Sequence, residues 1–121
     1  MKVITLLSLL VFFAVSSYAT EPTTTPSDIE KLYGAAWNGD VKALAALQAK
    51  AEKGDAHAEN YLGVMYQHGW SVKQDYTAAV KWFRLAAEQG FGEAQDSLWH
   101  FYFGGVGVPQ DYEEAYFWAT V

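Results

Sequence analysis

Apolar and small residues return at helical spacing along most of the chain, and their pattern repeats every 36 residues. In one unit they occupy positions 58, 62, 65 and 66 and then positions 79, 82, 83 and 86, which places them on one side of each of two helices. A glycine-containing loop separates the two runs, at residues 68–74 in one copy and at residues 104–110 in the next. Each unit is therefore predicted to consist of a helix, a loop, a second helix and a turn.

Identical residues at this offset support the repeat. They include Ala58 and Ala94, Leu62 and Leu98, Tyr66 and Tyr102, Gly69 and Gly105, Gln74 and Gln110, Asp75 and Asp111, and Trp82 and Trp118. Asp75 and Asp111 precede the second helix of each unit, where a carboxylate accepts hydrogen bonds from unpaired helical N–H groups. Gly54 and Gly90 stand where such helices end, so we expect a left-handed backbone conformation at both.

The pattern divides the chain after residue 27 into three units. Residues 28–54 are predicted to form a degenerate helix pair, with helices over 28–38 and 40–53. Residues 55–90 form a full repeat, and residues 91–121 form a second one that we expect to be incomplete at its C-terminus. Residues 20–27 are polar and contain two prolines, as in an extended linker. Ser27 and Glu30 fit a capping box, so the first helix is expected to begin after Ser27.

The first nineteen residues show the pattern of a secretory signal peptide. Lys2 gives a positive start, residues 3–15 are almost entirely apolar, and Ser17 and Ala19 are the small residues that a signal peptidase recognises. The apolar run is shorter than the roughly 20 residues that a membrane-spanning helix needs. We therefore expect cleavage after Ala19 and export to the periplasm or out of the cell, with an uncleaved N-terminal anchor as the alternative.

Two stretches of the repeat carry a specific signature. They are Ala58-x-x-x-Leu62-Gly63-x-x-Tyr66-x-x-Gly69 in the first copy and Gly105-x-Gly107-Val108-Pro109-Gln110-Asp111-Tyr112 in the second. These residues resemble Sel1-like repeats, which are relatives of the tetratricopeptide repeat. The resemblance implies an all-α fold, a right-handed α-solenoid of about two and a half to three helix-turn-helix repeats.

The sequence departs from the Sel1-like pattern at two positions. Trp99 stands where the first copy has the small residue Gly63, so we expect that helix to approach its partner less closely. Ser71 stands where the second copy has the loop residue Gly107, so we expect the loop of the first copy to bend differently.

Members of this family mostly act as adaptors that hold other proteins on the concave surface lined by the first helix of each repeat. The resemblance therefore implies a peptide or protein partner, bound by the residues at those positions. They are His57, Asn60, Val64, Gln67 and His68 in one unit and Glu93, Asp96, His100 and Phe103 in the next. An unoccupied, solvated face is the alternative. A cysteine-rich exported branch of the family is associated with penicillin binding and β-lactam hydrolysis, but its members pair cysteines within each repeat.

Composition narrows the chemistry further. A formal net charge of −6 argues against binding to nucleic acid or to anionic lipid, since both require a basic surface. The chain contains no cysteine, which excludes disulfides, thiolate metal sites and a cysteine nucleophile. It also weakens the analogy with the cysteine-rich branch.

No group of residues in the sequence predicts catalysis, a metal or a cofactor. His57 and His68 lie about 16 Å apart along one predicted helix, too far for one ion, and His100 adds no complete ligand set. Ser97 has no general base at a suitable spacing. The acidic pair at residues 113–114 lies in the first turn of a helix, where it complements the helix dipole.

The aromatic residues are interpreted mainly as core. Four of them fall on repeat positions and are predicted to be packed inside: Tyr66, Tyr102, Trp82 and Trp118. Trp70 lies in the loop, opposite Val106 in the second copy, and is predicted to be exposed. The sequence thus predicts a non-catalytic protein-binding scaffold of the bacterial cell envelope without a cofactor. A β-lactam hydrolase and a fragment of a longer solenoid are the alternatives, and the oligomeric state is left open.

Overall fold

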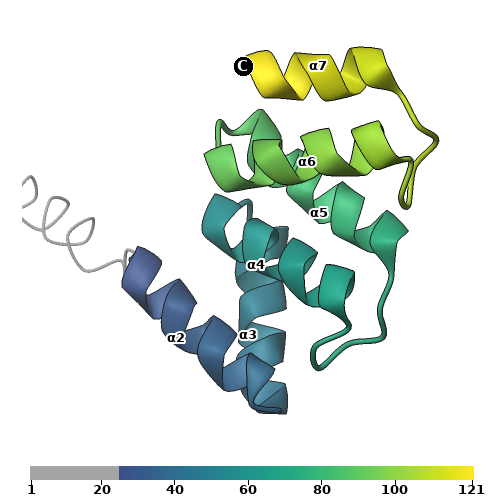
Figure 1. The fold of residues 1–121 in the computed structure, drawn as a ribbon. Helices are drawn as coiled ribbons and strands as arrows, with labels where there is room; N and C mark the ends of the chain where they lie inside the picture. Colours follow the sequence, from purple (N-terminus) through teal and green to yellow (C-terminus); the bar gives the residue numbers. More distant parts are fainter. Residues whose placement is uncertain (1–24) are drawn as a thin grey trace, which may run out of the picture.

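A computed structural model describes residues 25–121 and places six α-helices and no strand in this part of the chain (Figure 1). The helices are α2 Pro26–Trp37, α3 Val41–Glu52, α4 Ala56–His68, α5 Tyr76–Glu88, α6 Gly92–Gly104 and α7 Tyr112–Thr120. Each helix packs on the next one along the chain, and α2 also contacts α4. The result is an all-α solenoid of three helix pairs, which confirms the predicted fold class. The predicted signal peptide and residues 20–24 of the predicted linker lie outside the described residues.

Aspartates start most of the helices. The Asp75 carboxylate accepts a hydrogen bond from Ala78 N at 3.0 Å, and the Asp111 carboxylate accepts hydrogen bonds from the first turn of α7 at 3.0 and 3.1 Å. The predicted cap of the first helix is wrong. Helix α2 begins at Pro26, and its capping box pairs Thr25 with Asp28. Proline is favoured at this first helical position, because its missing N–H would have had no helical partner there.

The loops contain left-handed backbone at the predicted glycines and at one serine. Gly54 and Gly90 adopt φ values of 91° and 87°, as expected. The expectation for Ser71 is wrong, because its φ of 60° nearly equals the 68° of Gly107. The Ser71 hydroxyl donates a hydrogen bond to the Ala36 carbonyl at 2.6 Å, which offsets the cost of a left-handed conformation for a residue with a Cβ.

Two apolar clusters form the core. One lies within and between the first two helix pairs. It includes three buried residues of α3, Ala43, Leu47 and Ala51, and the residues of α5 that follow them by 36 positions are also buried. The other joins α5, α6 and α7. Among the predicted core aromatics, Tyr102 and Trp118 are buried, whereas Tyr66 and Trp82 are partly buried against the clusters.

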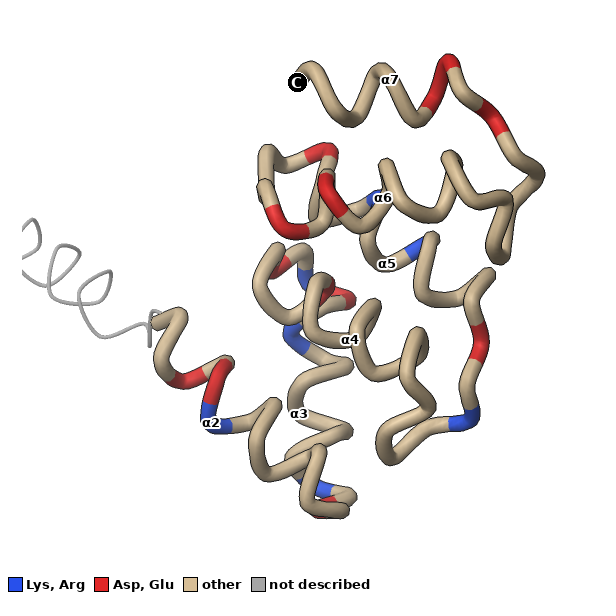
Figure 2. The backbone as a smooth tube through the Cα atoms, viewed as in Figure 1, with Lys and Arg blue, Asp and Glu red and all other residues tan. Residues whose placement is uncertain are grey.

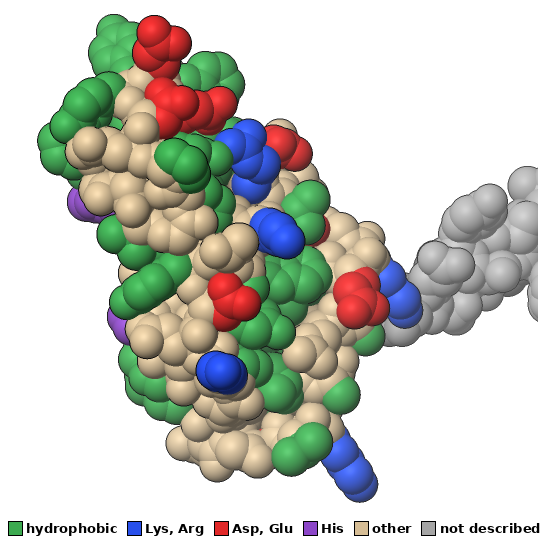
Figure 3. All heavy atoms as spheres, turned by 90° about the vertical axis from the view of Figure 1, so that its right-hand side faces the viewer, with side chains coloured by type: hydrophobic (Ala, Val, Ile, Leu, Met, Phe, Trp, Pro, Cys, Tyr) green, Lys and Arg blue, Asp and Glu red, His purple; other side chains and the backbone are tan. Residues whose placement is uncertain are grey.

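Charge is unevenly distributed along the solenoid. Residues 25–84 carry seven basic and seven acidic side chains, whereas residues 85–121 carry six acidic side chains and no basic one (Figure 2). Acidic and hydrophobic side chains lie next to each other at the α7 end of the molecule (Figure 3). Within residues 25–121, no helix is long and apolar enough to cross a bilayer.

Candidate functional site

The first helices of successive units, α2, α4 and α6, lie on the side of the solenoid that faces the viewer in Figure 1. The nine residues predicted to bind a partner all belong to α4 and α6. They do not form one continuous polar row, since the structure uses several of them inside the fold. They fall into three groups that differ in burial and contacts.

Two of the nine residues join α4 to α6. Asn60 is only 2% exposed, and its side-chain amide donates a hydrogen bond to the Glu93 carboxylate at 3.2 Å. A second inter-helix bond lies nearby, from the Gln89 amide to the Glu59 carboxylate at 2.8 Å, and Glu59 is also buried. Burial removes water from the Glu59 carboxylate and raises its pKa above its ordinary value. Asn60 therefore positions neighbouring helices and offers little surface to a partner.

A second group lies along α4. His57 packs edge-on against Phe91, with ring centroids 4.8 Å apart, and Val64 is partly buried against the core. His68 is exposed, and its ring stacks on Trp70 at 4.2 Å. Gln67 lines a cavity together with residues of α6.

The third group lies on α6 and is open to solvent. Asp96, His100 and Phe103 are exposed, and Phe103 stacks on Trp99 with ring centroids 5.1 Å apart. A cavity of about 290 Å³ lies between this group and Gln67. Its lining consists of Gln67, Tyr76, Ser97, His100, Phe101 and Val106. Two of the predicted residues, Gln67 and His100, thus meet at one cavity, and Phe103 lies on the same helix.

An aromatic row that the sequence did not predict continues on α2 and α4. Tyr33 stacks on Tyr61 at 4.3 Å, and Trp37 stacks on Trp70 at 4.4 Å. Trp70 is half-buried between Trp37 and His68, so the prediction that it is exposed is wrong. Burial raises the pKa of Tyr33 and of Tyr61 above the ordinary value. The sequence feature that could have indicated this aromatic row is Trp70 itself, because the equivalent residue of the next loop is Val106.

The cavity between α4 and α6 brings Ser97 and His100 close to each other. The Ser97 hydroxyl donates a hydrogen bond to the Glu93 carbonyl of its own helix at 3.0 Å, and no hydrogen bond joins it to His100 among the described residues. Residues 25–121 also contain no group of three His, Cys, Asp or Glu side chains placed to hold a metal ion.

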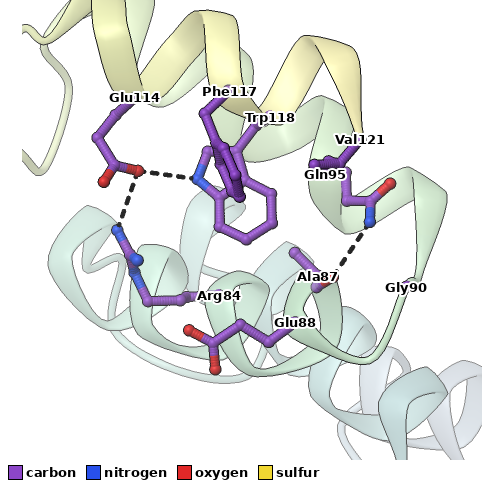
Figure 4. A pocket seen from close by; sticks show the side chains of 9 residues that line it. All are labelled: Arg84, Ala87, Glu88, Gly90, Gln95, Glu114, Phe117, Trp118 and Val121. Atoms are coloured by element: carbon purple, nitrogen blue, oxygen red, sulfur yellow. Dashed lines mark hydrogen bonds and ion pairs between the residues drawn. The ribbon is translucent and has the colours of Figure 1, made fainter.

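A second cavity, of about 530 Å³, lies between α5, α6 and α7 (Figure 4). Arg84 is at its edge, where it donates a hydrogen bond to the Tyr102 hydroxyl and pairs with the Glu114 carboxylate at 3.6 Å. The Trp118 indole N–H donates to the same carboxylate at 3.1 Å. Partial burial would lower the pKa of Arg84, but the bond to Tyr102 and the charge of Glu114 raise it above its usual value. Arg84 is therefore a fixed cation that is already paired.

Comparison with known proteins gives a consistent result. The sequence profile of the Sel1 repeat matches residues 56–91 and 94–120. A Sel1 repeat protein from Oxalobacter formigenes is similar in structure, with a TM-score of 0.68 and 30% identity, over 85% of this chain and 90% of that one. A protective antigen present in uropathogenic Escherichia coli strains, which displays an SLR fold, has a TM-score of 0.68 and 39% identity. That match covers 77% of this chain but only 21% of the antigen. Among curated protein sequences, none is significantly similar.

Proposed function

Because the chain belongs to the Sel1 repeat family, we propose that it is a non-catalytic scaffold that binds a peptide or protein partner between α4 and α6. Sel1 repeats commonly mediate protein interactions, and the family is generally non-catalytic. The proposal for this chain assigns the binding surface to the cavity beside Gln67 and His100 and to the neighbouring ring of Phe103.

The cavity of about 290 Å³ is the observation that carries the proposal. Ligand sites for small molecules and cofactors usually have volumes of about 300 to 1,000 Å³, so this one is at the lower limit and suits a side chain of a peptide. Its walls combine the apolar Phe101 and Val106 with the polar Gln67 and His100. Phe103 is 49% exposed beside it, and exposed aromatic residues are enriched where proteins bind one another.

Site-specific photocrosslinking tests this surface in cells. A photoreactive phenylalanine analogue at position 103 should crosslink one discrete partner, whereas the same analogue at position 85 should not. Leu85 is a matched control because it is 46% exposed but lies on α5, outside the groove. Equal crosslinking from both positions, or none from position 103, would contradict the proposed groove.

Alanine substitution of His100 and Phe103 provides an independent test of the same surface. Both side chains are exposed, so the variant should keep the helical circular dichroism of the parent chain while its crosslinked or captured partner is lost. Asn60 is unsuitable for this purpose, because its removal would leave the Glu93 bond unmade and alter the packing of α4 on α6.

We propose in addition that the scaffold acts in the cell envelope after export. The support is the secretory pattern of residues 1–19 in the sequence. Mass spectrometry of the protein recovered from cells should find Thr20 at its N-terminus. A retained Met1 in the recovered protein would contradict export by cleavage.

The non-catalytic assignment is tested by β-lactam hydrolysis, the activity that the cysteine-rich relatives suggest. We expect purified protein to turn over the chromogenic substrate nitrocefin no faster than the same sample after heat inactivation. Turnover that saturates with substrate and disappears on heating would replace the scaffold proposal with an enzymatic one.

A further inference from the structure

Helix α7 and the residue after it expose an unusual amount of apolar surface. Four large apolar side chains are exposed within ten residues, and we call them the α7 surface: Tyr112, Tyr116, Phe117 and Val121, which are 61%, 72%, 53% and 61% exposed. Single exposed apolar residues are common in proteins, whereas several exposed apolar side chains on one short helix are typical of a docking surface.

The preceding unit indicates what kind of element would cover this surface. Val80 of α5 stands 36 positions before Tyr116 and is only 5% exposed, within the apolar cluster that also contains residues of α6. Tyr76, the counterpart of Tyr112, lies beside Phe101 of α6, with ring centroids 6.1 Å apart. Of the α7 surface, Tyr116 therefore stands at a position that is buried on α5, whereas the counterparts of Tyr112 and Val121 on α5 are 40% and 46% exposed.

The cavity of about 530 Å³ continues from the α7 surface, since Phe117 and Val121 also form part of its lining (Figure 4). Trp118 contributes the ring of an aromatic wall, and Glu88 lies on the opposite side. Among the described residues no hydrogen bond or ion pair joins the Glu88 carboxylate to another side chain, although its charge helps to raise the pKa of Arg84 in the same cavity. The long aliphatic stem and cationic head of a lysine or arginine would match this combination of aromatic wall and carboxylate.

Charge distinguishes between the possible occupants. Residues 85–121 carry six acidic side chains and no basic one, and the nearest cation, Arg84, is already paired with Glu114. Two copies of this chain that met through their α7 surfaces would bring the exposed Glu113 of each copy together, and like charges at an interface disfavour association. A basic partner would instead be attracted to the same surface.

We propose that the α7 surface is a second docking site, which adjoins the α4–α6 groove where the Tyr112 ring lies 5.4 Å from that of Phe103, and that its occupant is a basic amphipathic helix of a partner protein. The apolar stripe of that helix covers Tyr116 and Phe117. Its lysines or arginines lie over the acidic side chains, with one reaching Glu88 in the cavity. Such helix-in-groove recognition depends on apolar residues at helical spacing together with complementary charge.

Three synthetic peptides and fluorescence polarisation test the proposal with the protein as purified from cells. The first peptide is an amphipathic helix with a leucine stripe flanked by lysines, the second has glutamates in place of the lysines, and the third has the residues of the first in an order without a stripe. We expect the first peptide to bind roughly tenfold more tightly than either of the others, with affinity that falls as salt rises.

Surface variants then locate the binding site. Replacing Tyr116 and Phe117 with serine should weaken binding of the lysine peptide roughly tenfold, and Glu88→Gln should weaken it several-fold. Leu85→Ser is the matched control, because Leu85 is an exposed apolar residue on α5. This variant should bind the lysine peptide as tightly as the parent chain. All these side chains are exposed, so unchanged circular dichroism is expected for each variant.

Three outcomes would overturn the proposal. One is equal binding of the striped and unstriped lysine peptides, which would mean attraction by charge alone. Another is unchanged affinity in the Tyr116 and Phe117 variant. The third is sedimentation of the parent chain as a dimer that the same variant converts to a monomer, which would assign the surface to a second copy. None of these experiments alters Phe103 or uses it as a probe. Their failure is therefore distinguishable from failure of the groove proposal, which is tested at position 103.

Discussion

The two Sel1 repeats of this protein have the same hydrogen bonds in their loops but differ in how far their second helices are buried. In the first loop the Gln74 amide donates to the Gln67 carbonyl at 2.8 Å and to the Tyr76 hydroxyl at 3.0 Å. In the second, Gln110 makes the same two bonds, to Phe103 and Tyr112, both at 2.9 Å. The loops are therefore specified locally, by side chains that satisfy carbonyls at the end of the preceding helix.

The burial of apolar side chains, in contrast to these hydrogen bonds, differs between equivalent positions of the two repeats. Phe83 of α5 is completely buried, and its ring lies 5.9 Å from that of Phe101 on the following helix. The residue of α7 that corresponds to Phe83 is Ala119, which is exposed. The two repeats also differ at the position of Gly63, where the second repeat has Trp99. Equivalent positions in a repeat thus share hydrogen bonds because these are local, whereas their burial depends on which neighbour lies against them.

Truncation of Phe83 should have the largest effect on stability. Phe83→Ala is expected to lower the free energy of unfolding by about 3 to 5 kcal/mol, because it removes a fully buried ring and leaves a cavity. Phe117→Ala in α7 should cost less than about 1 kcal/mol, since that ring is largely exposed. Urea denaturation followed by circular dichroism measures both, and equal losses would break the comparison between the two helices.

Replacing the loop residues that share a left-handed backbone should separate the two loops. Gly107→Ala is expected to cost about 3 kcal/mol, because a Cβ at that φ of +68° would also lie 2.7 Å from backbone atoms of Tyr76. Ser71→Gly should be nearly neutral, since the lost hydrogen bond to Ala36 is offset by relief of backbone strain. Thermal melting of the two variants provides the measurement. A larger loss of stability for Ser71→Gly than for Gly107→Ala would contradict this prediction.

Two glycines within helices should respond in opposite directions. A Cβ at Gly63 would lie 2.7 Å from the buried Phe83 ring, so Gly63→Ala is expected to destabilise the fold by about 1 to 2 kcal/mol. A Cβ at Gly34 of α2 would meet no atom within 4 Å, so Gly34→Ala should stabilise by up to about 1 kcal/mol through helix propensity alone. In a Phe83→Leu background the Gly63 penalty should shrink, and a penalty of unchanged size would contradict direct contact between the two positions.

The smallest expected effect concerns the pH dependence of the contact between α4 and the end of α5, where the Gln89 amide donates to the Glu59 carboxylate. The pKa of Glu59 is raised in the fold by burial, so the folded state favours its protonated form. The associated stability is present below the pKa of the unfolded chain and is lost as pH rises through the higher folded value. Glu59→Gln should therefore melt at a higher temperature than the parent at pH 7, with the difference shrinking toward pH 4. A difference independent of pH would contradict this account.

The fold was largely predictable from the sequence because its determinants are local and repeated. The 36-residue period, the aspartate caps and the loop glycines define the helices and their order without reference to distant residues. The start of α2 was missed because Ser27 and Thr25 both offer a hydroxyl and an acid three residues later, and the choice depends on Pro26. Ser71 was misjudged because its hydroxyl finds the Ala36 carbonyl, 35 residues away in sequence.

The candidate site was predictable only in outline. The repeat register correctly placed Gln67, His100 and Phe103 on neighbouring first helices, but it could not separate them from Asn60, which lies on the same helix as Gln67 and is buried against Glu93. The stack of Trp37, Trp70 and His68 joins residues that have no shared position in the repeat. Such contacts depend on the rotation of one helix against another, and that rotation is set by the whole core.

The sequence by itself therefore determined the family, the all-α solenoid and the net negative charge, since each follows from residue type and spacing along the chain. Only the tertiary structure decided which apolar residues are covered and which stay open to a partner. Val80 and Tyr116 occupy the same position of the repeat, and one is buried while the other is exposed. The reason is that burial is a property of two packed surfaces, and the sequence of one helix describes only one of them.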